Sequence, residues 1–92
     1  MLFVVAKAKT NAGKDQEFLQ VTKELIAETR KEAGCVSYFL YQSTEDITEF
    51  TFLEQWESQA ALDAHAASPH FVKFQNAAES ILAGLDIKQY NA

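Results

Sequence analysis

The stretch CVSYFLYQSTEDITEFTFLEQW, residues 35 to 56, decides the fold because it holds two strand patterns joined by a short polar turn. Residues 35–43 and 47–56 are rich in aromatic and β-branched side chains, which favour strands. The intervening Thr44-Glu45-Asp46 has typical turn composition. A connection this short predicts an antiparallel hairpin.

Both strands of the hairpin carry large side chains on two faces. In the first strand, alternation predicts one face with Val36, Tyr38 and Leu40 and another with Cys35, Phe39 and Tyr41. In the second strand it predicts one face with Phe50, Phe52, Glu54 and Trp56 and another with Thr51, Leu53 and Gln55. We expect one face of the sheet to pack on helices and the other on a second copy of the chain.

The remaining segments read as helices and two further strands. The pattern predicts strands over 2–9 and 85–90, a long amphipathic helix over 14–32, a short helix over 59–66 and a helix over 70–83. Gly34 and Gly84 are expected to end the two longer helices, and Ser68-Pro69 is a strong start signal. The order strand, helix, strand, strand, helix, strand predicts an α+β ferredoxin-like split βαβ fold, an antiparallel sheet with helices on one face.

Size and composition limit the organisation and the partners. The 92 residues fit a single domain, residues 1–92, and 48% of them are hydrophobic, a surplus that favours a ligand pocket or a subunit interface. A net charge of −5 with scattered basic residues argues against nucleic-acid binding. The only cysteine, Cys35, indicates a reducing compartment, and residues 2–6 are too short an apolar run for a membrane span, so a cytoplasmic location is expected.

Two segments together resemble the antibiotic biosynthesis monooxygenase family. EAGCVSYFLYQ, residues 32–42, resembles the family's E-x-G-C-x-x-Y segment. FTFLEQWESQAALDAHAASPHF, residues 50–71, resembles its more specific segment: an aromatic strand ending in E-x-W, a short helix ending in Ala-x-x-His, and a Pro-His-Phe helix start. The resemblance covers about nine tenths of the chain and implies a homodimeric α+β barrel in which two sheets pack together.

The resemblance also implies a range of activities. Enzymatic members oxidise aromatic or quinol substrates with molecular oxygen and use no flavin, haem or metal; other relatives isomerise a small phosphorylated signal metabolite, degrade haem, or have no known reaction. Haem-degrading members carry a Trp where this chain has His65 and an axial His near Gln75, so haem degradation is not expected. Fold alone does not choose among the remaining activities.

The two histidines are the first candidate site residues. His65 has two readings of equal weight: a cation at the end of a short helix, or an acid or base facing a pocket. Because Leu62 is the only large apolar residue of that helix and lies three positions before His65, we expect His65 to point inward, towards Trp56. For His70 a structural role is favoured over a ligand contact. Two histidines alone do not make a metal site, so no metal is expected.

Glu54 is the second candidate, because a carboxylate between Phe52 and Trp56 must be paired, protonated or functional. An ion pair with a Lys or Arg across the sheet is slightly favoured as its explanation. The predicted substrate contacts are Trp56, Phe52, Tyr38, His70 and Phe74. Cys35 is expected to be a buried strand residue.

Three functions follow as hypotheses. The first is a cofactor-independent monooxygenase that acts on an aromatic or quinol-like small molecule, with His65 as base and Glu54 or a Tyr as the orienting group. The second is an isomerase of a small carbonyl or sugar-like metabolite, in which His65 shuttles a proton. The third is a non-catalytic dimeric module that binds a small apolar ligand. A titratable group that touches solvent in the pocket would favour an enzyme.

Overall fold

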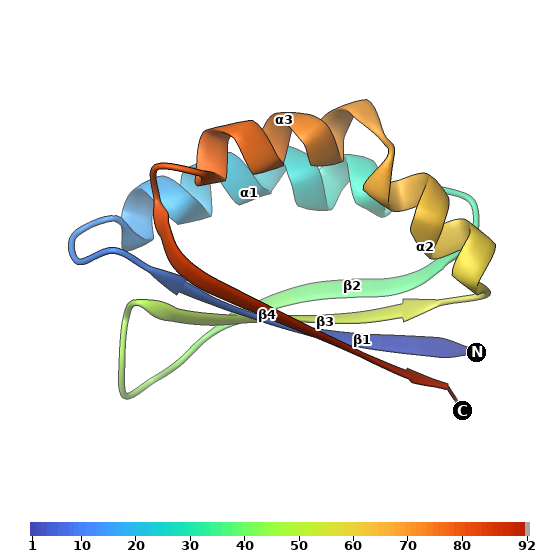
Figure 1. Ribbon diagram of the computed structural model, residues 1–92, viewed down its shortest axis with the longest axis horizontal. Coiled ribbons are helices and arrows are strands. Elements are labelled where there is room, and N and C mark those ends of the chain that lie inside the picture. Colours follow the sequence, from blue (N-terminus) through green and yellow to red (C-terminus); the bar gives the residue numbers. More distant parts are fainter. Residues whose placement is uncertain (92) are drawn as a thin grey trace.

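A computed structural model describes residues 1–91 and shows one sheet with all its helices on one side (Figure 1). The elements in chain order are β1 (Leu2–Thr10), α1 (Asp15–Thr29), β2 (Cys35–Gln42), β3 (Glu49–Trp56), α2 (Gln59–Ala66), α3 (Pro69–Ala78) and β4 (Leu82–Asn91). This order confirms the ferredoxin-like α+β prediction, with α2 as a short additional helix between β3 and α3.

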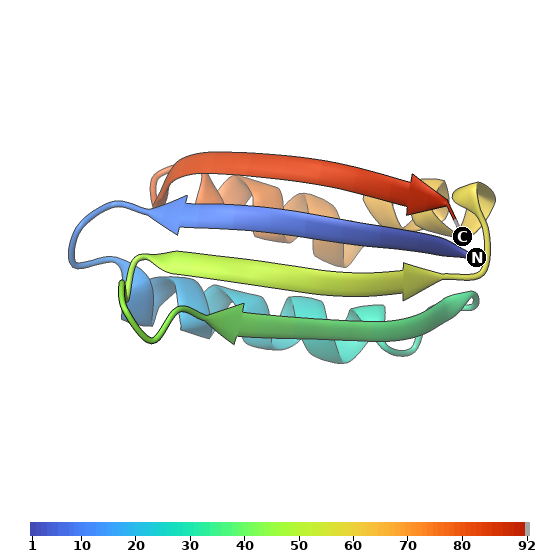
Figure 2. The ribbon, with the colours of Figure 1, turned by 90° about the horizontal axis from the view of Figure 1, so that it is seen from below.

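The four strands pair antiparallel in the order β2-β3-β1-β4, as Figure 2 shows from the side without helices. The predicted hairpin is therefore correct and forms one edge of the sheet. Register fixes which side chains share a face: Ala6 pairs with Phe52 on one side and Ile87 on the other, and Val4 pairs with Glu54 and Gln89. These residues all lie on the helix side.

An aromatic cluster seals the sheet against the helices. Phe18 of α1 is fully buried, with its ring centroid 4.7 Å from that of Phe50 and 6.0 Å from that of Phe74 on α3. Tilted and edge-on ring contacts of this kind add to the gain from burying apolar area. Phe18 and Leu25 lie seven residues apart, about two helical turns, and so share the face of α1 that packs on the sheet.

The strand β2 departs from simple alternation at its start. The register shifts between Cys35 and Ser37, so that Cys35 lies opposite Trp56 on the core side and Val36 is about half exposed. The predicted faces of Cys35 and Val36 were therefore wrong, because a bulge adds one unpaired residue and reverses the alternation before it. Tyr38 and Leu40 on one face and Phe39 and Tyr41 on the other were correct.

The connection from α3 to β4 also differs from the prediction. Helix α3 ends at Ala78 rather than at Ala83, and β4 begins at Leu82, so Gly84 lies inside a strand. Ile81 is buried in the turn and its amide donates to the Ala78 carbonyl. Over the few residues that follow Ala78, the spacing of apolar residues fits a helix and a strand equally well. Pairing with β1 makes the segment from Leu82 a strand.

The sheet face opposite the helices carries several large apolar side chains among charged ones, and nothing in residues 1–91 covers it. Its half-exposed large residues are Phe3, Phe39, Tyr41, Leu53 and Tyr90. Patches of this kind on small domains commonly mark an interface. The dimer stays a prediction. None of the helices in residues 1–91 has the length and apolarity needed to cross a bilayer.

Candidate functional site

Helix α2 and the start of α3 place the two histidines. The Ser58 hydroxyl accepts a hydrogen bond from the Ala61 amide and starts α2. At the junction, the Ser68 hydroxyl donates to the His65 carbonyl at 2.6 Å and accepts from the Phe71 amide at 3.3 Å. This one side chain closes α2 and opens α3, so His65 and His70 are held at a fixed separation. Their ring centroids are 6.0 Å apart.

His65 points inward, as its spacing from Leu62 predicted. The residue is 3% exposed, and its ring centroid lies 4.8 Å from that of Trp56 and 4.9 Å from that of Phe71. Burial lowers the pKa of His65, and a hydrogen bond to Glu32 partly opposes that effect. The ring is therefore neutral at neutral pH, which is the form that can accept a proton.

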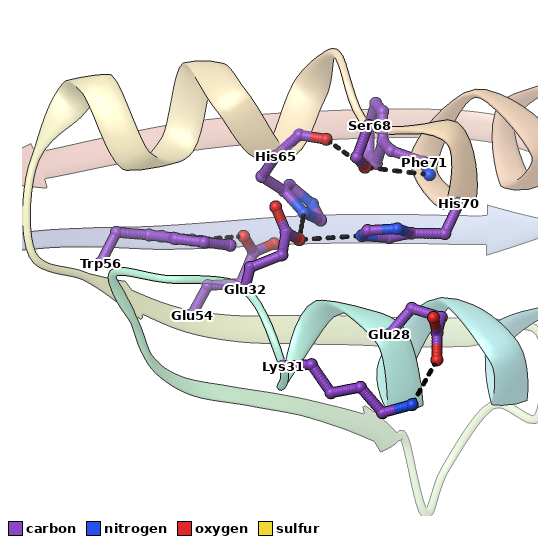
Figure 3. A network of polar contacts seen from close by, with 9 residues as sticks. All are labelled: Glu28, Lys31, Glu32, Glu54, Trp56, His65, Ser68, His70 and Phe71. Carbon is purple, nitrogen blue, oxygen red and sulfur yellow. Dashed lines mark hydrogen bonds and ion pairs between the residues drawn. The ribbon is translucent and has the colours of Figure 1, made fainter.

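Glu32 is the residue that joins the two histidines (Figure 3). Its Oε2 atom lies 2.7 Å from Nδ1 of His65 and 2.9 Å from Nε2 of His70. A carboxylate can only accept, so each of these ring nitrogens donates its proton to the same oxygen. The three side chains come from the loop after α1, from α2 and from α3, and the cluster ties these segments together.

The loop from α1 to β2 brings Glu32 to this position. Helix α1 ends at Thr29, three residues before the predicted end. In the turn that follows, the Glu32 amide donates a hydrogen bond to the Thr29 carbonyl, and the Cys35 amide donates one to the Glu32 carbonyl. Gly34 has φ +87°, and a Cβ at this position would lie 2.5 Å from Cβ of Ala61 on α2. Gly34 thus permits both the left-handed backbone and the close approach of α2, rather than capping the helix directly.

Glu54 lies on β3 below the cluster. The indole Nε1 of Trp56 donates to Oε1 of Glu54 at 3.0 Å, and no ion pair with Lys or Arg reaches Glu54 within residues 1–91. The explanation by a cross-sheet ion pair was therefore wrong. Burial raises the pKa of Glu54 to about 7, opposed by the Trp56 hydrogen bond and reinforced by the charge of Glu32. Near neutral pH this carboxyl group exists in both the protonated and the ionised form.

Two adjoining recesses open between the α2–α3 segment and β4. The larger has a volume of about 370 Å³ and the smaller about 180 Å³. Both are lined by Glu54, Phe71 and Ile87, and His65 lines the smaller one. The walls of the larger recess are mostly apolar with a small number of polar groups, which is the usual composition of a small-molecule site, whereas about half of the residues that line the smaller recess are polar.

The predicted substrate contacts divide into two groups. Phe52, Tyr38 and Phe74 line the larger recess, and burial raises the pKa of Tyr38, which keeps its phenol neutral. Trp56 is fully buried behind Glu54 and lines neither recess. His70 borders the groove between α1 and α3 instead. The structure therefore brings His65, Glu54 and three of the five predicted contacts to one place.

Glu32 was missed as a functional candidate. It is 33 residues from His65 in the chain, and nothing in local spacing links the two. The signal in the sequence that points to Glu32 is its position at the start of the E-x-G-C segment.

Glu32, His65 and His70 also offer three ligand atoms within 4.8 Å of one another, of types that suit zinc. In the structure these atoms form hydrogen bonds instead, because Oε2 of Glu32 accepts one from each of the two histidine rings. The expectation of no metal remains a prediction.

A larger hollow of about 580 Å³ lies at the other end of the sheet. Its walls include Lys7, Lys9, Glu49 and Asp86, and Lys9 forms ion pairs with Glu49 and with Asp46 of the neighbouring turn. The side chains of Lys7, Lys9, Glu49 and Asp86 are exposed to solvent, which weakens ion pairs of this kind. The recesses beside Glu54 are the stronger candidate because they join apolar walls to buried titratable groups.

A family profile and several known proteins match the sequence of this chain. The profile of the antibiotic biosynthesis monooxygenase family matches residues 1–77. YcnE of Bacillus subtilis, named as a candidate monooxygenase, is 31% identical over 95% of this chain and 93% of its own length. An uncharacterised Synechocystis protein, sll1783, is 33% identical over 89% of this chain, which spans only 56% of that protein.

Solved structures show the same fold. PA3566 of Pseudomonas aeruginosa has a TM-score of 0.94 with 32% identity, covering 99% of this chain and 92% of that one. A conserved protein of Methanosarcina mazei has a TM-score of 0.91 with 38% identity, covering 97% and 89%. Because the family profile spans most of the chain, including Glu32, Glu54, His65 and His70, the protein belongs to the antibiotic biosynthesis monooxygenase family.

Proposed function

We propose that the protein is a cofactor-independent monooxygenase that oxidises a neutral aromatic or quinol-like small molecule in the recess beside Glu54. Family membership supports a monooxygenase-like function. A relative from Escherichia coli, YgiN, is named as a candidate quinol monooxygenase and is 28% identical over 96% of this chain. The observation that carries the proposal is a buried, neutral histidine and a buried carboxyl group on the wall of one recess, which adjoins a larger, mostly apolar one.

In this proposal, His65 removes a proton from the substrate and the resulting anion donates an electron to O₂. All four electrons that reduce O₂ come from the substrate: one oxygen atom enters the product and the other leaves as water. No external reductant is needed. The protein supplies the base and a site with little water.

Glu54 is proposed to orient the substrate. Because one of its oxygens accepts from Trp56, the other is available to bind a substrate hydroxyl or carbonyl group. The protonated form donates to a carbonyl, and the ionised form accepts from a hydroxyl. The same residue can therefore bind a quinol before the reaction and a quinone after it.

The charge of the recess favours a neutral substrate. Glu54, Asp63 and Glu79 line the two recesses, and neither wall contains Lys or Arg among the residues that the structure describes. A phosphorylated substrate would meet carboxylates without a cation, which is electrostatically unfavourable. This observation disfavours the isomerase hypothesis for a phosphorylated metabolite.

The test is turnover of a panel of quinols and anthrones, measured as oxygen uptake and compared with anaerobic controls. His65→Asn is the sharpest variant, because its side-chain amide can still donate to Glu32 where Nδ1 does but has no equivalent of Nε2. We expect a loss of turnover of roughly 10²-fold or more and a change of about 1 kcal/mol or less in the free energy of unfolding. Lys73→Ala, on the exposed side of α3, is the matched control and should keep full turnover.

Full activity of His65→Asn would refute the role of His65 as base. Ligand binding without any oxygen uptake would favour the binding-module hypothesis. Stoichiometric iron, zinc or flavin in the purified protein would refute cofactor independence.

A further inference from the structure

The hydrogen-bond partners of His65 leave one of its ring nitrogens free. Nδ1 donates to Glu32, and no hydrogen bond involves Nε2 among residues 1–91. The residue is 3% exposed, so water rarely reaches the ring from outside, yet it lines the smaller recess. Glu32 lines neither recess. The two nitrogens therefore have separate surroundings: Nδ1 faces the polar cluster, and Nε2 lies on the opposite side of the ring.

The tautomer of the ring follows from this arrangement. In a free histidine side chain the proton prefers Nε2, whereas the Glu32 carboxylate requires it on Nδ1. A ring protonated on Nδ1 has its lone pair on Nε2. This is the tautomer that can accept a proton from a ligand in the recess.

We infer that Glu32 and His70 are positioning residues that hold His65 in the Nδ1–H tautomer and so make Nε2 the basic atom of the site. The inference rests on the proposed function of His65 as base. Glu32 sets the tautomer directly, since its Oε2 lies 2.7 Å from Nδ1. His70 donates to the same oxygen at 2.9 Å from a second direction, so the carboxylate cannot swing away without losing a second hydrogen bond (Figure 3).

Glu32 also stabilises the state that follows proton transfer. When a substrate O–H proton moves to Nε2, the ring becomes an imidazolium that retains its Nδ1 proton, and the substrate becomes an anion. Glu32 remains a carboxylate and now faces a positive ring in a site shielded from water, where the attraction is stronger than at the surface. No proton passes through Glu32 or His70.

The position of His70 is itself built into the fold. It lies in the first turn of α3 behind the Ser68 cap and Pro69, and its side chain is 16% exposed. Its ring therefore closes the cluster on the solvent side, as His65 does on the recess side. A residue that only filled space here would need no N–H group directed at Glu32.

The first test is ¹⁵N NMR of the histidine side chains, which distinguishes the two tautomers and needs no substrate. In the wild-type protein at pH 8 we expect His65 to show a protonated Nδ1 and an unprotonated Nε2. Glu32→Ala should shift His65 towards the Nε2–H tautomer. A wild-type His65 with its proton on Nε2 would overturn the inference.

The second test separates position from packing at residue 70. The amide nitrogen of His70→Gln can replace Nε2 as a donor, whereas His70→Phe fills the space without donating. We expect His70→Gln to keep the Nδ1–H tautomer of His65 and His70→Phe to give a mixture of tautomers. Equal spectra for the two variants would remove His70 from the inference.

The third test is kinetic, on whichever substrate the panel identifies. Glu32→Gln should lower kcat by about 10-fold or more with little change in KM, because substrate contacts are intact while the imidazolium loses its countercharge. Unchanged kcat would overturn the positioning role. The two proposals can fail separately. If His65 has the expected tautomer but the His65→Asn variant is active, only the role of His65 as base is refuted. If His65 has the opposite tautomer and the His65→Asn variant is inactive, only the positioning role of Glu32 and His70 is refuted.

Discussion

The two halves of the helix-covered face differ in how completely they are closed. Over β2 and β3, α1 buries Phe18 and Leu25 almost fully against the sheet. Over β4, α3 leaves Leu85 and Ile87 about half exposed, and the recesses open there. The buried titratable groups lie next to the open half. The difference teaches that burial over β2 and β3 stabilises the fold, whereas the open half over β4 is where we propose that the substrate binds.

The largest expected effect tests this division directly. Phe18→Ala removes a fully buried ring that touches three other aromatic rings, so it should lower the free energy of unfolding by about 3–5 kcal/mol. Ile87→Ala, in the open half, should cost less than about 1 kcal/mol, because the side chain is 52% exposed. Urea denaturation measures both. Similar losses in the two variants would mean that the halves do not differ.

The next effect concerns Glu54 and depends on pH. Its pKa is raised from 4.5 to about 7 in the folded protein, so the unfolded chain ionises first and the stability contributed by neutral Glu54 is lost as pH rises between those values. Glu54→Gln removes this loss. The free energy of unfolding of the variant, relative to that of the wild type, should therefore rise by about 3 kcal/mol between pH 4 and pH 8.

Glu79→Gln is the matched control for that experiment, since Glu79 lines the same recess but is exposed. It should show no comparable pH dependence relative to wild type. A flat difference between Glu54→Gln and wild type would mean that the carboxyl group stays ionised when buried.

Glycine substitutions sharpen the comparison at the polar cluster. Gly34→Ala should lower the free energy of unfolding by about 2–3 kcal/mol, because it strains the backbone at a positive φ and places the new Cβ 2.5 Å from Cβ of Ala61. Gly13 has a similar positive φ, but a Cβ at this position would meet no atom of residues 1–91 within 4 Å. Gly13→Ala should therefore lower the free energy of unfolding by only about 1 kcal/mol. The difference, measured by thermal unfolding, isolates the close approach of α2. Equal costs would show that the loop can relax without moving α2.

The smallest expected effect concerns the uncovered face of the sheet. We predict that the chain dimerises through Phe39, Leu53 and their neighbours, since nothing in residues 1–91 covers these half-exposed apolar side chains. Leu53→Lys should weaken the dimer by about 10-fold or more in Kd, equivalent to about 1.4 kcal/mol. Val72→Lys, at an equally exposed position on α3, should leave it unchanged. Sedimentation of the wild type as a monomer at micromolar concentration would contradict this prediction.

Sequence patterns predicted most of the fold and two of the site residues, Glu54 and His65. The hairpin, the inward face of α1, the bounds of α2 and the inward direction of His65 all follow from local periodicity, because side-chain spacing within one element fixes which residues share a face. The end of α3 and the faces of Cys35 and Val36 were wrong, because strand pairing and a bulge with distant partners decide them.

The sequence by itself therefore determined the order of elements, the apolar faces and the presence of Glu54 and His65 on the core side. Only the tertiary structure decided that Glu32 meets His65 and His70, that Trp56 rather than a cation satisfies Glu54, and that β4 leaves a recess open. Local periodicity is set by bonded geometry over a few residues. The protonation and tautomer of a buried group are set by whichever distant atoms the packed chain brings within hydrogen-bond distance.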